Sequence, residues 1–375
     1  MAGTVRVAEA EGGRTLKDFF EVPYIVQGKN PLWVPPLRVQ QKELHDEKKH
    51  PFYQHAQVRR FTAYLDGAPA GRIAAIWDDN HNTTHKESTC FFGFFESLRD
   101  REVTDALFEN VERAAREWGA DVVRGPFNPS INEDIGLLVD AFDKPPVVMM
   151  PYNPDYYPEF VEQQGYGKAM DTLCYYIDHS LLNEKLRRGA EIVRKRTKVT
   201  TRHFDKNRFW DEALRIWEVY SRAWEKNWGA VAMTEPEFKH LAKDLKQIFD
   251  PDLINLAEDE KGELIGFSLA LPNINEALIR IRDGRLFPFG LPKLIRYSRK
   301  ISSVRVIIMG VLEEYRGRGI DALFHYDNFL VGERKGYHWG EIGWVLETND
   351  MMKRAAELVG AKPYKTYRIY EKTLQ

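Results

Sequence analysis

The chain has 375 residues, which exceeds the usual size of one domain and is enough to bury two hydrophobic cores. Its formal net charge of -2, with 29% charged residues, excludes the basic excess of a nucleic-acid coat, and its two cysteines exclude a disulfide framework. The first residues carry no apolar signal core and no apolar run could span a bilayer, so we expect a cytoplasmic protein without a membrane partner. No histidine stands at zinc-ligand spacing from a cysteine, so we expect no metal.

The N-terminal half predicts several strands around one long helix. The helix over 101–118 has apolar residues at every third or fourth position, which indicates one packed face, and Asp100 is placed to cap it. Cys90 and Cys174 lie in apolar strand contexts and are expected in the core. The other predicted elements are strands over 62–65, 72–77, 91–95, 121–125 and 172–177, and a short helix over 153–164.

A basic, helical connector over 181–197 leads into the C-terminal half. There a helix over 211–226 is followed by a loop with Asn227 and Trp228, and Thr234 is a predicted cap for the next helix. An insertion over 273–300 is rich in Lys and Arg, which is typical of a solvated face and is also consistent with a lid over an anionic substrate. The predicted strands of this half are 254–257, 264–271 and 304–312.

The turn from Arg316 to Gly319 separates the apolar strand over 304–312 from a helix over 320–335. Gly317 and Gly319 lack a Cβ, so the backbone can bend sharply and approach a ligand. The free N–H groups and the positive dipole end of the new helix point at such a ligand, and Arg316 and Arg318 add full positive charge. The turn therefore predicts a phosphate site, although a short glycine-rich motif also occurs in turns that bind nothing.

This segment resembles the GNAT superfamily of acyl-CoA-dependent N-acyltransferases, whose signature Arg/Gln-x-x-Gly-x-Gly/Ala follows the fourth strand. Arg316 and Gly319 match it, and Tyr315 matches the Tyr that commonly precedes it. The sequence departs from the pattern at Glu313 and Asp321, and a Tyr that many members carry in the next helix falls at about Ala356. The resemblance implies that acetyl-CoA or another acyl-CoA is the co-substrate. It implies these cofactor-binding residues: Val311, Leu312, Arg316, Gly317, Arg318, Gly319, Ile320 and Asn349.

The same resemblance predicts attack of an amine on a thioester, which needs a base. Strand alternation over 338–349 puts Glu341, Glu347 and Asn349 on one face. Glu347 lies nearest the loop end and is our favoured general base, with a helix cap or an ion pair as the alternative role; Glu341 is the weaker candidate. We expect Asn227 and Trp228 to contact the substrate, a small-molecule or peptide amine.

The GNAT-like elements occur twice. Asp105-Ala106-Leu107-Phe108 recurs as Asp321-Ala322-Leu323-Phe324, and the same offset aligns strand 91–95 with 307–311. The first copy has Asp100-Arg101-Glu102-Val103 in place of the Arg-Gly turn, which suits a helix cap and not a pyrophosphate. We predict an α+β fold of two tandem GNAT-like domains, each a mixed, mostly antiparallel sheet flanked by helices. The limits are 1–180 for a degenerate copy and 198–375 for the copy with the acyl-CoA site.

Three function classes fit these observations. The first is an acyl-CoA-dependent N-acyltransferase, with acetyl as the expected acyl group. The second is a Fem-type aminoacyl-tRNA-dependent transferase, which also resembles two fused GNAT domains; the intact Arg-Gly turn argues against it, and we expect no nucleic-acid partner. The third is a non-catalytic acyl-CoA binder, favoured by Asp321 and Ala356. The fold alone does not decide among them.

Overall fold

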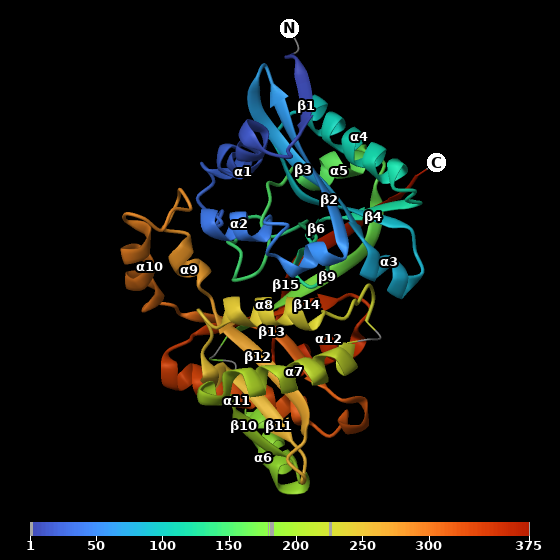
Figure 1. Ribbon diagram of the computed structural model, residues 1–375. Helices are drawn as coiled ribbons and strands as arrows, with labels where there is room; N and C mark the ends of the chain where they lie inside the picture. The colour runs from blue at the N-terminus through green and yellow to red at the C-terminus, as the bar shows by residue number, and fades with distance from the viewer. Residues whose placement is uncertain (1–2, 179, 181–183, 225–226, 375) are drawn as a thin grey trace. The chain divides into compact units, whose positions relative to one another are not determined.

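A computed structural model describes residues 3–178, 180, 184–224 and 227–374. Contacts divide the chain into two compact units, which we describe one at a time (Figure 1). Unit 1 comprises Met1–Asp171, Asn275–Ser298 and Thr366–Gln375, and unit 2 comprises Thr172–Ile274 and Arg299–Lys365. Each unit thus draws on more than one stretch of the chain, and the predicted domain limits at 180 and 198 stay a prediction.

Unit 1 is a sheet with strand order β1-β2-β3-β4-β5-β15. Neighbouring strands are antiparallel except β4 and β5, which are parallel. The strands are β1 (Val5–Glu9), β2 (Ala56–Leu65), β3 (Ala68–Asp78), β4 (Thr89–Ser97), β5 (Val122–Gly125), β6 (Phe127–Asn128), β7 (Asp134–Ile135), β8 (Leu137–Leu138) and β15 (Lys362–Thr373). The α-helices are α1 (Gly13–Gln27), α2 (Arg38–Leu44), α3 (Asp79–His85), α4 (Arg101–Glu117), α5 (Tyr157–Gln163), α9 (Asn275–Leu278) and α10 (Gly290–Ser298).

The core of unit 1 forms where α4 packs on the sheet. Val103, Leu107, Val111 and Ala115 are all buried, which confirms the predicted packed face of this helix. The Asp100 carboxylate accepts a hydrogen bond from the Val103 N–H at 3.2 Å, so the predicted cap is also confirmed. The first copy therefore closes its helix start with its own side chain.

Unit 2 is a sheet with strand order β9-β14-β13-β12-β11-β10, in which only β13 and β14 are parallel. The capping box of Thr234 and Glu237 begins α8 as predicted. The strands are β9 (Gly167–Asp178), β10 (Thr200–His203), β11 (Ile254–Glu258), β12 (Leu264–Pro272), β13 (Ser303–Val311) and β14 (Trp339–Leu346). The α-helices are α6 (Glu184–Arg196), α7 (Phe209–Trp224), α8 (Glu235–Leu245), α11 (Ile320–Lys335) and α12 (Asp350–Leu358). The mixed sheets flanked by helices confirm the predicted α+β fold class.

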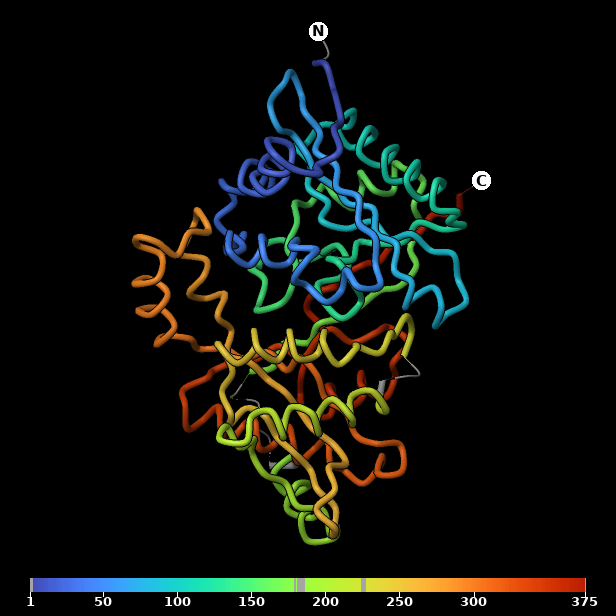
Figure 2. Tube along the Cα trace, in the orientation of Figure 1, coloured from blue at the N-terminus to red at the C-terminus, as the bar shows by residue number. Residues whose placement is uncertain are grey.

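The last strands of the two sequence repeats are exchanged. β15 ends the second half of the chain, yet Tyr370 to Thr373 pair antiparallel with β5 in unit 1. β9 belongs to the first half, yet Thr172 to Asp178 pair antiparallel with β14 in unit 2. The sequence repeat predicts which segments form strands. It does not predict which of the two sheets each strand joins. In the Cα trace of Figure 2, β9 is coloured green and β15 is coloured red.

The basic insertion belongs to unit 1 and not to the C-terminal copy over which we expected it. Arg282 donates hydrogen bonds to the carbonyls of Gly28, Asn30 and Trp33 at 3.1, 2.5 and 2.6 Å. Asn275 donates to the Val147 carbonyl at 2.8 Å. These bonds give each of these loop carbonyls a hydrogen-bond donor. The sequence pattern could not predict these donors, because they lie far away along the chain.

The two cysteines are buried and free, as expected for core residues. Burial raises the pKa of the Cys90 thiol to about 12 and that of the Cys174 thiol well above its usual range. Within the described residues, no helix combines the length and the apolar character needed to cross a membrane.

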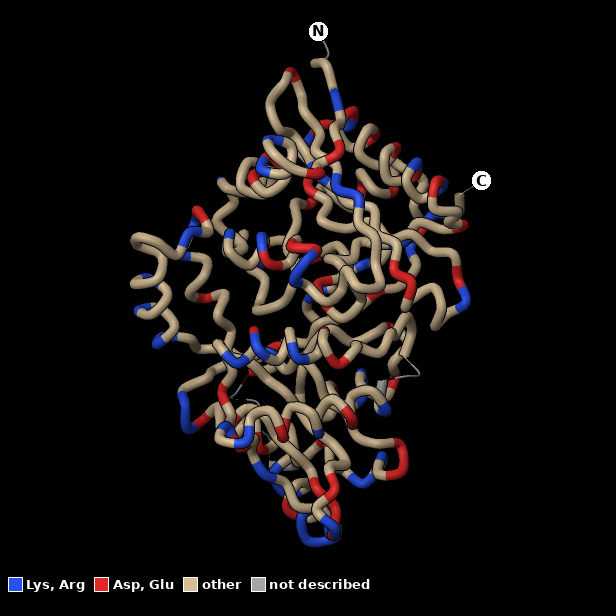
Figure 3. The backbone as a smooth tube through the Cα atoms, in the orientation of Figure 1, with Lys and Arg blue, Asp and Glu red and all other residues tan. Residues whose placement is uncertain are grey.

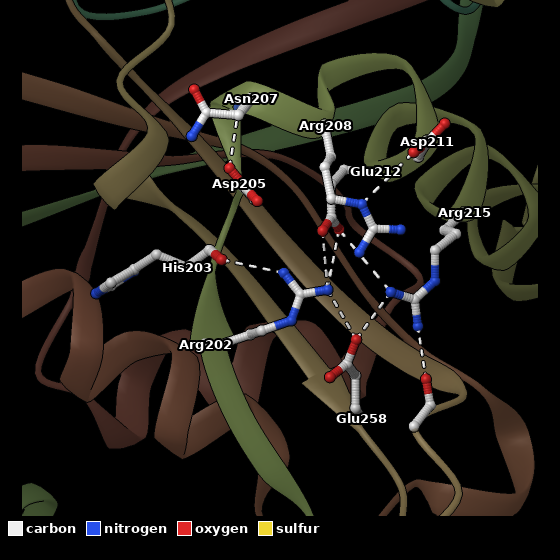
Figure 4. A network of polar contacts seen from close by, with 10 residues as sticks. Arg202, His203, Asp205, Asn207, Arg208, Asp211, Glu212, Arg215 and Glu258 are labelled. Atoms are coloured by element: carbon white, nitrogen blue, oxygen red, sulfur yellow. Dashed lines mark hydrogen bonds and ion pairs between the residues drawn. The ribbon is translucent and has the colours of Figure 1, made fainter.

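A charged network ties α7 to the edge of the unit 2 sheet (Figure 4). Arg202 on β10 donates to Glu212 at 3.0 Å and to Glu258 at 2.7 Å, and Arg215 on α7 donates to Glu258 at 2.8 Å. The hydrogen bond from Arg202 lowers the pKa of Glu258 below its ordinary value of 4.5. Since Glu212 is only 1% exposed, the network holds a buried carboxylate between helix and sheet.

The depressed pKa of Glu258 predicts an acid-sensitive contribution to stability. The carboxylate stabilises the fold fully above about pH 4.5, and the stabilisation is lost as pH falls through the lower folded pKa. We expect Glu258→Gln to lower the free energy of unfolding at pH 7 by about 1–2 kcal/mol. We also expect the free energy of unfolding of this variant to change less between pH 7 and pH 3.5. Urea unfolding at pH 7 and at pH 3.5 measures both effects.

Glu260→Gln is the matched control, because Glu260 pairs with Lys198 where both side chains are largely exposed. Its effect should stay below about 0.5 kcal/mol at either pH. An equal loss for Glu258→Gln at both pH values would show that the charge of Glu258 contributes nothing.

Candidate active site

The site is organised by two parallel strands that separate. β13 and β14 pair from Ser303↔Trp339 to Val306↔Ile342, and the register extends no further in this fully described segment, although β13 continues to Val311 and β14 to Leu346. On its other side β13 stays paired with β12, with a register shift opposite Leu269 and Ala270. The second half of β13 therefore has one edge that β14 does not cover.

Backbone groups of β13 alternate between β12 and this uncovered edge. Leu312 donates its N–H to the Ile265 carbonyl at 2.9 Å, so the Gly266↔Val311 pair is the kind that exchanges no hydrogen bonds across the ladder. The N–H and C=O of Val311 consequently face the uncovered edge. We expected Leu312 to bind the cofactor beside Val311, but its N–H cannot do so because the ladder with β12 uses it.

The predicted turn lies directly beyond this edge. Gly317 and Gly319 have φ angles of 74° and 81°, a left-handed conformation that glycine adopts without strain. A Cβ on Gly319 would lie 2.6 Å from a methyl of Val193 on α6, so packing also requires glycine there. Ile320 is buried and begins α11, and no side chain caps that helix. Its first N–H groups are thus available for an anion.

Arg316 and Arg318 add two exposed cations to the turn. Arg316 donates through Nε to the Val311 carbonyl at 3.0 Å and through Nη2 to the Ala223 carbonyl at 3.2 Å. Arg318 donates to the Glu314 carbonyl at 3.0 Å and lies 4.8 Å above the Tyr315 ring. Arg316 therefore joins the uncovered edge of β13 to the end of α7.

Asn227 and Trp228 follow α7 shortly after the Ala223 carbonyl that Arg316 contacts. Both are half-buried, and the Asn227 carbonyl accepts the Ala230 N–H at 3.1 Å in a tight turn. Asn227 lies four residues along the chain from Ala223, whose carbonyl is the direct contact of the Arg316 guanidinium. Their role in substrate binding stays a prediction.

Glu347 and Asn349 follow the end of β14. Because β13 and β14 are parallel, their last residues, Val311 and Leu346, lie at the same end of the sheet. Glu347 is half-buried in the turn, and its carbonyl accepts from Lys353 Nζ at 2.6 Å. Asn349 caps α12 by accepting the Met352 N–H at 3.1 Å, so the cap role belongs to Asn349; its role in cofactor binding stays a prediction.

The alternation that grouped Glu341 with Glu347 does not hold along β14. The register with β9 shifts between Ile342 and Val345, which reverses the faces of the residues beyond it, and the strand ends before Glu347. Glu341 is fully buried. Its burial favours a structural role, and Glu347 remains the favoured base.

Sequence reasoning missed Arg305, which lies at the point where the strands separate. Arg305 is 2% exposed and donates to the Gly343 carbonyl through Nε at 3.2 Å and Nη2 at 2.9 Å. Its Nε lies 3.7 Å from the Glu341 carboxylate, which also accepts a hydrogen bond from Tyr364. The available signal was an arginine inside an otherwise apolar strand, and the register places it directly opposite Glu341 on the next strand.

The described residues contain no cluster of three or more His, Cys, Asp or Glu side chains that could hold a metal ion. Ala356, where many GNAT members carry a Tyr, is 1% exposed and packs in the core of unit 2. The groups that the structure brings to this site are backbone groups, the arginines of the turn and Glu347.

In the first copy the equivalent opening is filled by the chain itself. β4 and β5 also pair over only three residues, from Thr89↔Val122 to Phe91↔Arg124. Beyond them Phe94 donates its N–H to the Asn128 side chain at 2.6 Å, and a Cβ on Gly93 would lie 1.8 Å from the Phe127 carbonyl oxygen. With the edge occupied and α4 capped by Asp100, the first copy is degenerate.

One open and one filled copy of the same fold define a tandem GNAT fold. A tandem GNAT protein from the clavulanic acid biosynthesis pathway has a TM-score of 0.59 to this chain at 12% identity, covering 99% of this chain and 98% of that one. No family model matches the chain.

Two relatives match at much higher identity. The chain is 37% identical to Bacterial ceramide synthase of Caulobacter vibrioides, over 96% of this chain and 95% of that protein. It is 36% identical to Protein YghO of Escherichia coli, over 96% of this chain and 93% of that protein. The chain belongs to the family of these two proteins.

The placement of Glu341 predicts a structural effect. Glu341→Gln keeps the acceptor for Tyr364 but leaves the buried Arg305 without its carboxylate, which should cost about 3 kcal/mol in the free energy of unfolding. Adding Arg305→Met should recover part of that loss, because the unpaired buried charge is removed. Urea unfolding of the parent, both single variants and the double variant gives the coupling.

A loss of turnover in Glu341→Gln without a loss of stability would contradict this assignment and make Glu341 the base.

Proposed function

We propose that this protein transfers a long acyl chain from acyl-CoA to the amino group of a long-chain amino alcohol. The observation that carries the proposal is the uncovered edge of β13, which leads directly into an uncapped helix start with two arginines. A relative at 37% identity is named a ceramide synthase, and a ceramide is the amide of a fatty acid and a long-chain amino alcohol. That name favours a long acyl group over the acetyl group expected from the sequence.

Different groups of the site would hold different parts of the thioester substrate. The N–H and C=O of Val311 face the uncovered edge and would pair with the amide-bearing arm of CoA as a neighbouring strand does. The N–H groups at the start of α11, from Gly319 onward, would hold the pyrophosphate. Arg316 and Arg318 supply the charge that this anion needs, and Gly317 lets the backbone approach it.

The reaction forms a C–N bond and breaks the C–S bond of the thioester. The neutral amine attacks the carbonyl carbon, the tetrahedral oxyanion collapses, and CoA leaves as the thiolate. The attacking nitrogen must lose a proton, which Glu347 would accept directly or through a water. Backbone N–H groups at the edge of β13 would stabilise the oxyanion.

Binding of CoA tests the site separately from turnover. A ligand at about a hundredfold excess over Kd stabilises the folded state by about 2.7 kcal/mol. For a unit of this size that corresponds to a rise in Tm of roughly 5–10 °C. We expect Arg316→Ala to abolish this rise, measured by thermal unfolding with and without CoA.

Arg101→Ala is the matched control, because Arg101 starts the equivalent helix of the first copy and pairs with Asp105 on the surface. It should leave the rise intact. No shift in the parent protein at millimolar CoA would contradict the site, and loss of the shift in Arg101→Ala would move it to the first copy.

Turnover tests the donor, the acceptor and the base. With sphinganine as acceptor, we expect mass spectrometry to detect amide formation from palmitoyl-CoA and much less from acetyl-CoA. Glu347→Gln keeps the shape and removes the base, so kcat should fall by about 10²- to 10⁴-fold while the CoA-induced rise in Tm survives.

Asp350→Asn is the control for Glu347→Gln, because it removes a nearby carboxylate that pairs with Lys353 on the surface. Its turnover should stay within about twofold of the parent. Full activity of Glu347→Gln would reject the base, and CoA binding without acylation of any amine would favour the non-catalytic reading.

A further inference from the structure

The insertion in unit 1 has a fixed base. Asn275 and Arg282 bond to carbonyls on two other loops of unit 1, and the Arg38 N–H donates to the Gly284 carbonyl at 3.0 Å. A Cβ on Gly284 would lie 2.3 Å from the Tyr24 hydroxyl, so the backbone is in close contact there. The segment is thus held in place from residue 275 to residue 284.

The tip of the same insertion exposes large apolar side chains. Phe287 and Phe289 are each 73% exposed and Ile295 is 51% exposed. Pro288 and Pro292 are exposed beside them, and the spacing of 289, 292 and 295 keeps these residues on one face of the segment that forms α10. Leu291 and Leu294 point the other way and are half-buried, so the exposed face is not the packing face of the helix.

The apolar tip carries only positive charge. Arg285, Lys293 and Arg296 are exposed around it, and no Asp or Glu occurs from Arg285 to Lys300. Figure 3 shows basic positions along α10 without an acidic one between them. The chain as a whole is close to neutral, with 54 Lys and Arg against 56 Asp and Glu. The charge is therefore a local property of the insertion.

We propose that α10 and the preceding loop, residues 285–296, dock the protein on a membrane surface that contains anionic lipids. A short amphipathic helix with exposed aromatic and aliphatic residues ringed by Lys and Arg matches the two layers of such a surface: the acyl boundary takes the apolar face and the headgroups pair with the cations. Exposed apolar area of this size is otherwise costly in water. This departs from our expectation of no membrane partner and from the idea of a lid for an anionic substrate.

RNA phosphates would pair with the cations, and unpaired bases could stack on the exposed phenylalanines. RNA offers no comparable partner for the aliphatic side chains of Pro292 and Ile295 on the same face. The combination in one twelve-residue segment favours a lipid surface over a nucleic acid.

Vesicle sedimentation with the full-length protein tests the proposal without any acyltransfer step. We expect binding to vesicles of phosphatidylcholine with 30% phosphatidylglycerol, weak binding to pure phosphatidylcholine, and a decline as salt screens the charges. Lys293→Glu/Arg296→Glu should weaken binding at least about 25-fold, at about fivefold for each charge. Phe287→Ser/Phe289→Ser should weaken it about tenfold or more, also at high salt.

Matched controls change the same residue types elsewhere. Lys86→Glu/Lys261→Glu removes two exposed lysines outside the insertion, and Leu330→Ser/Leu358→Ser removes two exposed apolar side chains from unit 2. Both should bind vesicles as the parent does. Because the insertion variants leave the Arg316 turn untouched, they should keep the CoA-induced rise in Tm, so failure here and failure of the proposed function can be told apart.

Three results would overturn the proposal: equal binding to neutral and anionic vesicles, binding that survives both insertion variants, or no vesicle binding together with salt-sensitive binding of tRNA that Lys293→Glu/Arg296→Glu abolishes. The last result would assign the insertion to RNA.

Discussion

The separation of β13 and β14 depends on one buried arginine. Past Val306↔Ile342 the ladder stops, and a strand carbonyl without a partner in the protein interior costs free energy. Arg305 removes that cost by donating twice to Gly343, and Glu341 neutralises the guanidinium. Gly343 must itself be glycine, because a Cβ there would lie 2.7 Å from the Cys174 sulfur. The uncovered edge of β13 begins at this junction, and the register with β12 then turns the N–H and C=O of Val311 toward that edge.

In both copies two parallel strands separate, but the resulting opening is filled in the first copy and uncovered in the second. In the first copy the backbone of residues 127–128 fills the opening, with Asn128 bonded to the N–H of Phe94. In the second copy the Val311 carbonyl instead meets Arg316, a long side chain at the surface that can exchange its partner for a phosphate. The first copy fills the opening with its own chain, and the second keeps the groups that we propose bind the ligand.

Local features could be predicted from the sequence, because they depend on residues that are close along the chain. The helix over 320–335, the caps Asp100 and Thr234 and the packed face of α4 needed only spacing and residue type. The resemblance to GNAT proteins, extended by the repeat, then predicted the α+β class. What failed depended on distant partners: Leu312 is turned toward Ile265 by the register with β12, and Glu341 is taken out of the presumed face by a register shift against β9. Arg305 could not be assigned, because its importance lies in where two strands part.

The exchange of β9 and β15 explains why a degenerate copy is retained. Unit 1 needs residues 370–373 of the second half to complete its sheet, and unit 2 needs residues 172–178 of the first half. Neither sheet is complete with its own half of the chain, so loss of the first copy would leave β14 with an unpaired edge and its buried residues exposed. The first copy has a filled opening but still contributes a strand to unit 2, and the basic, apolar-tipped insertion is bonded to unit 1.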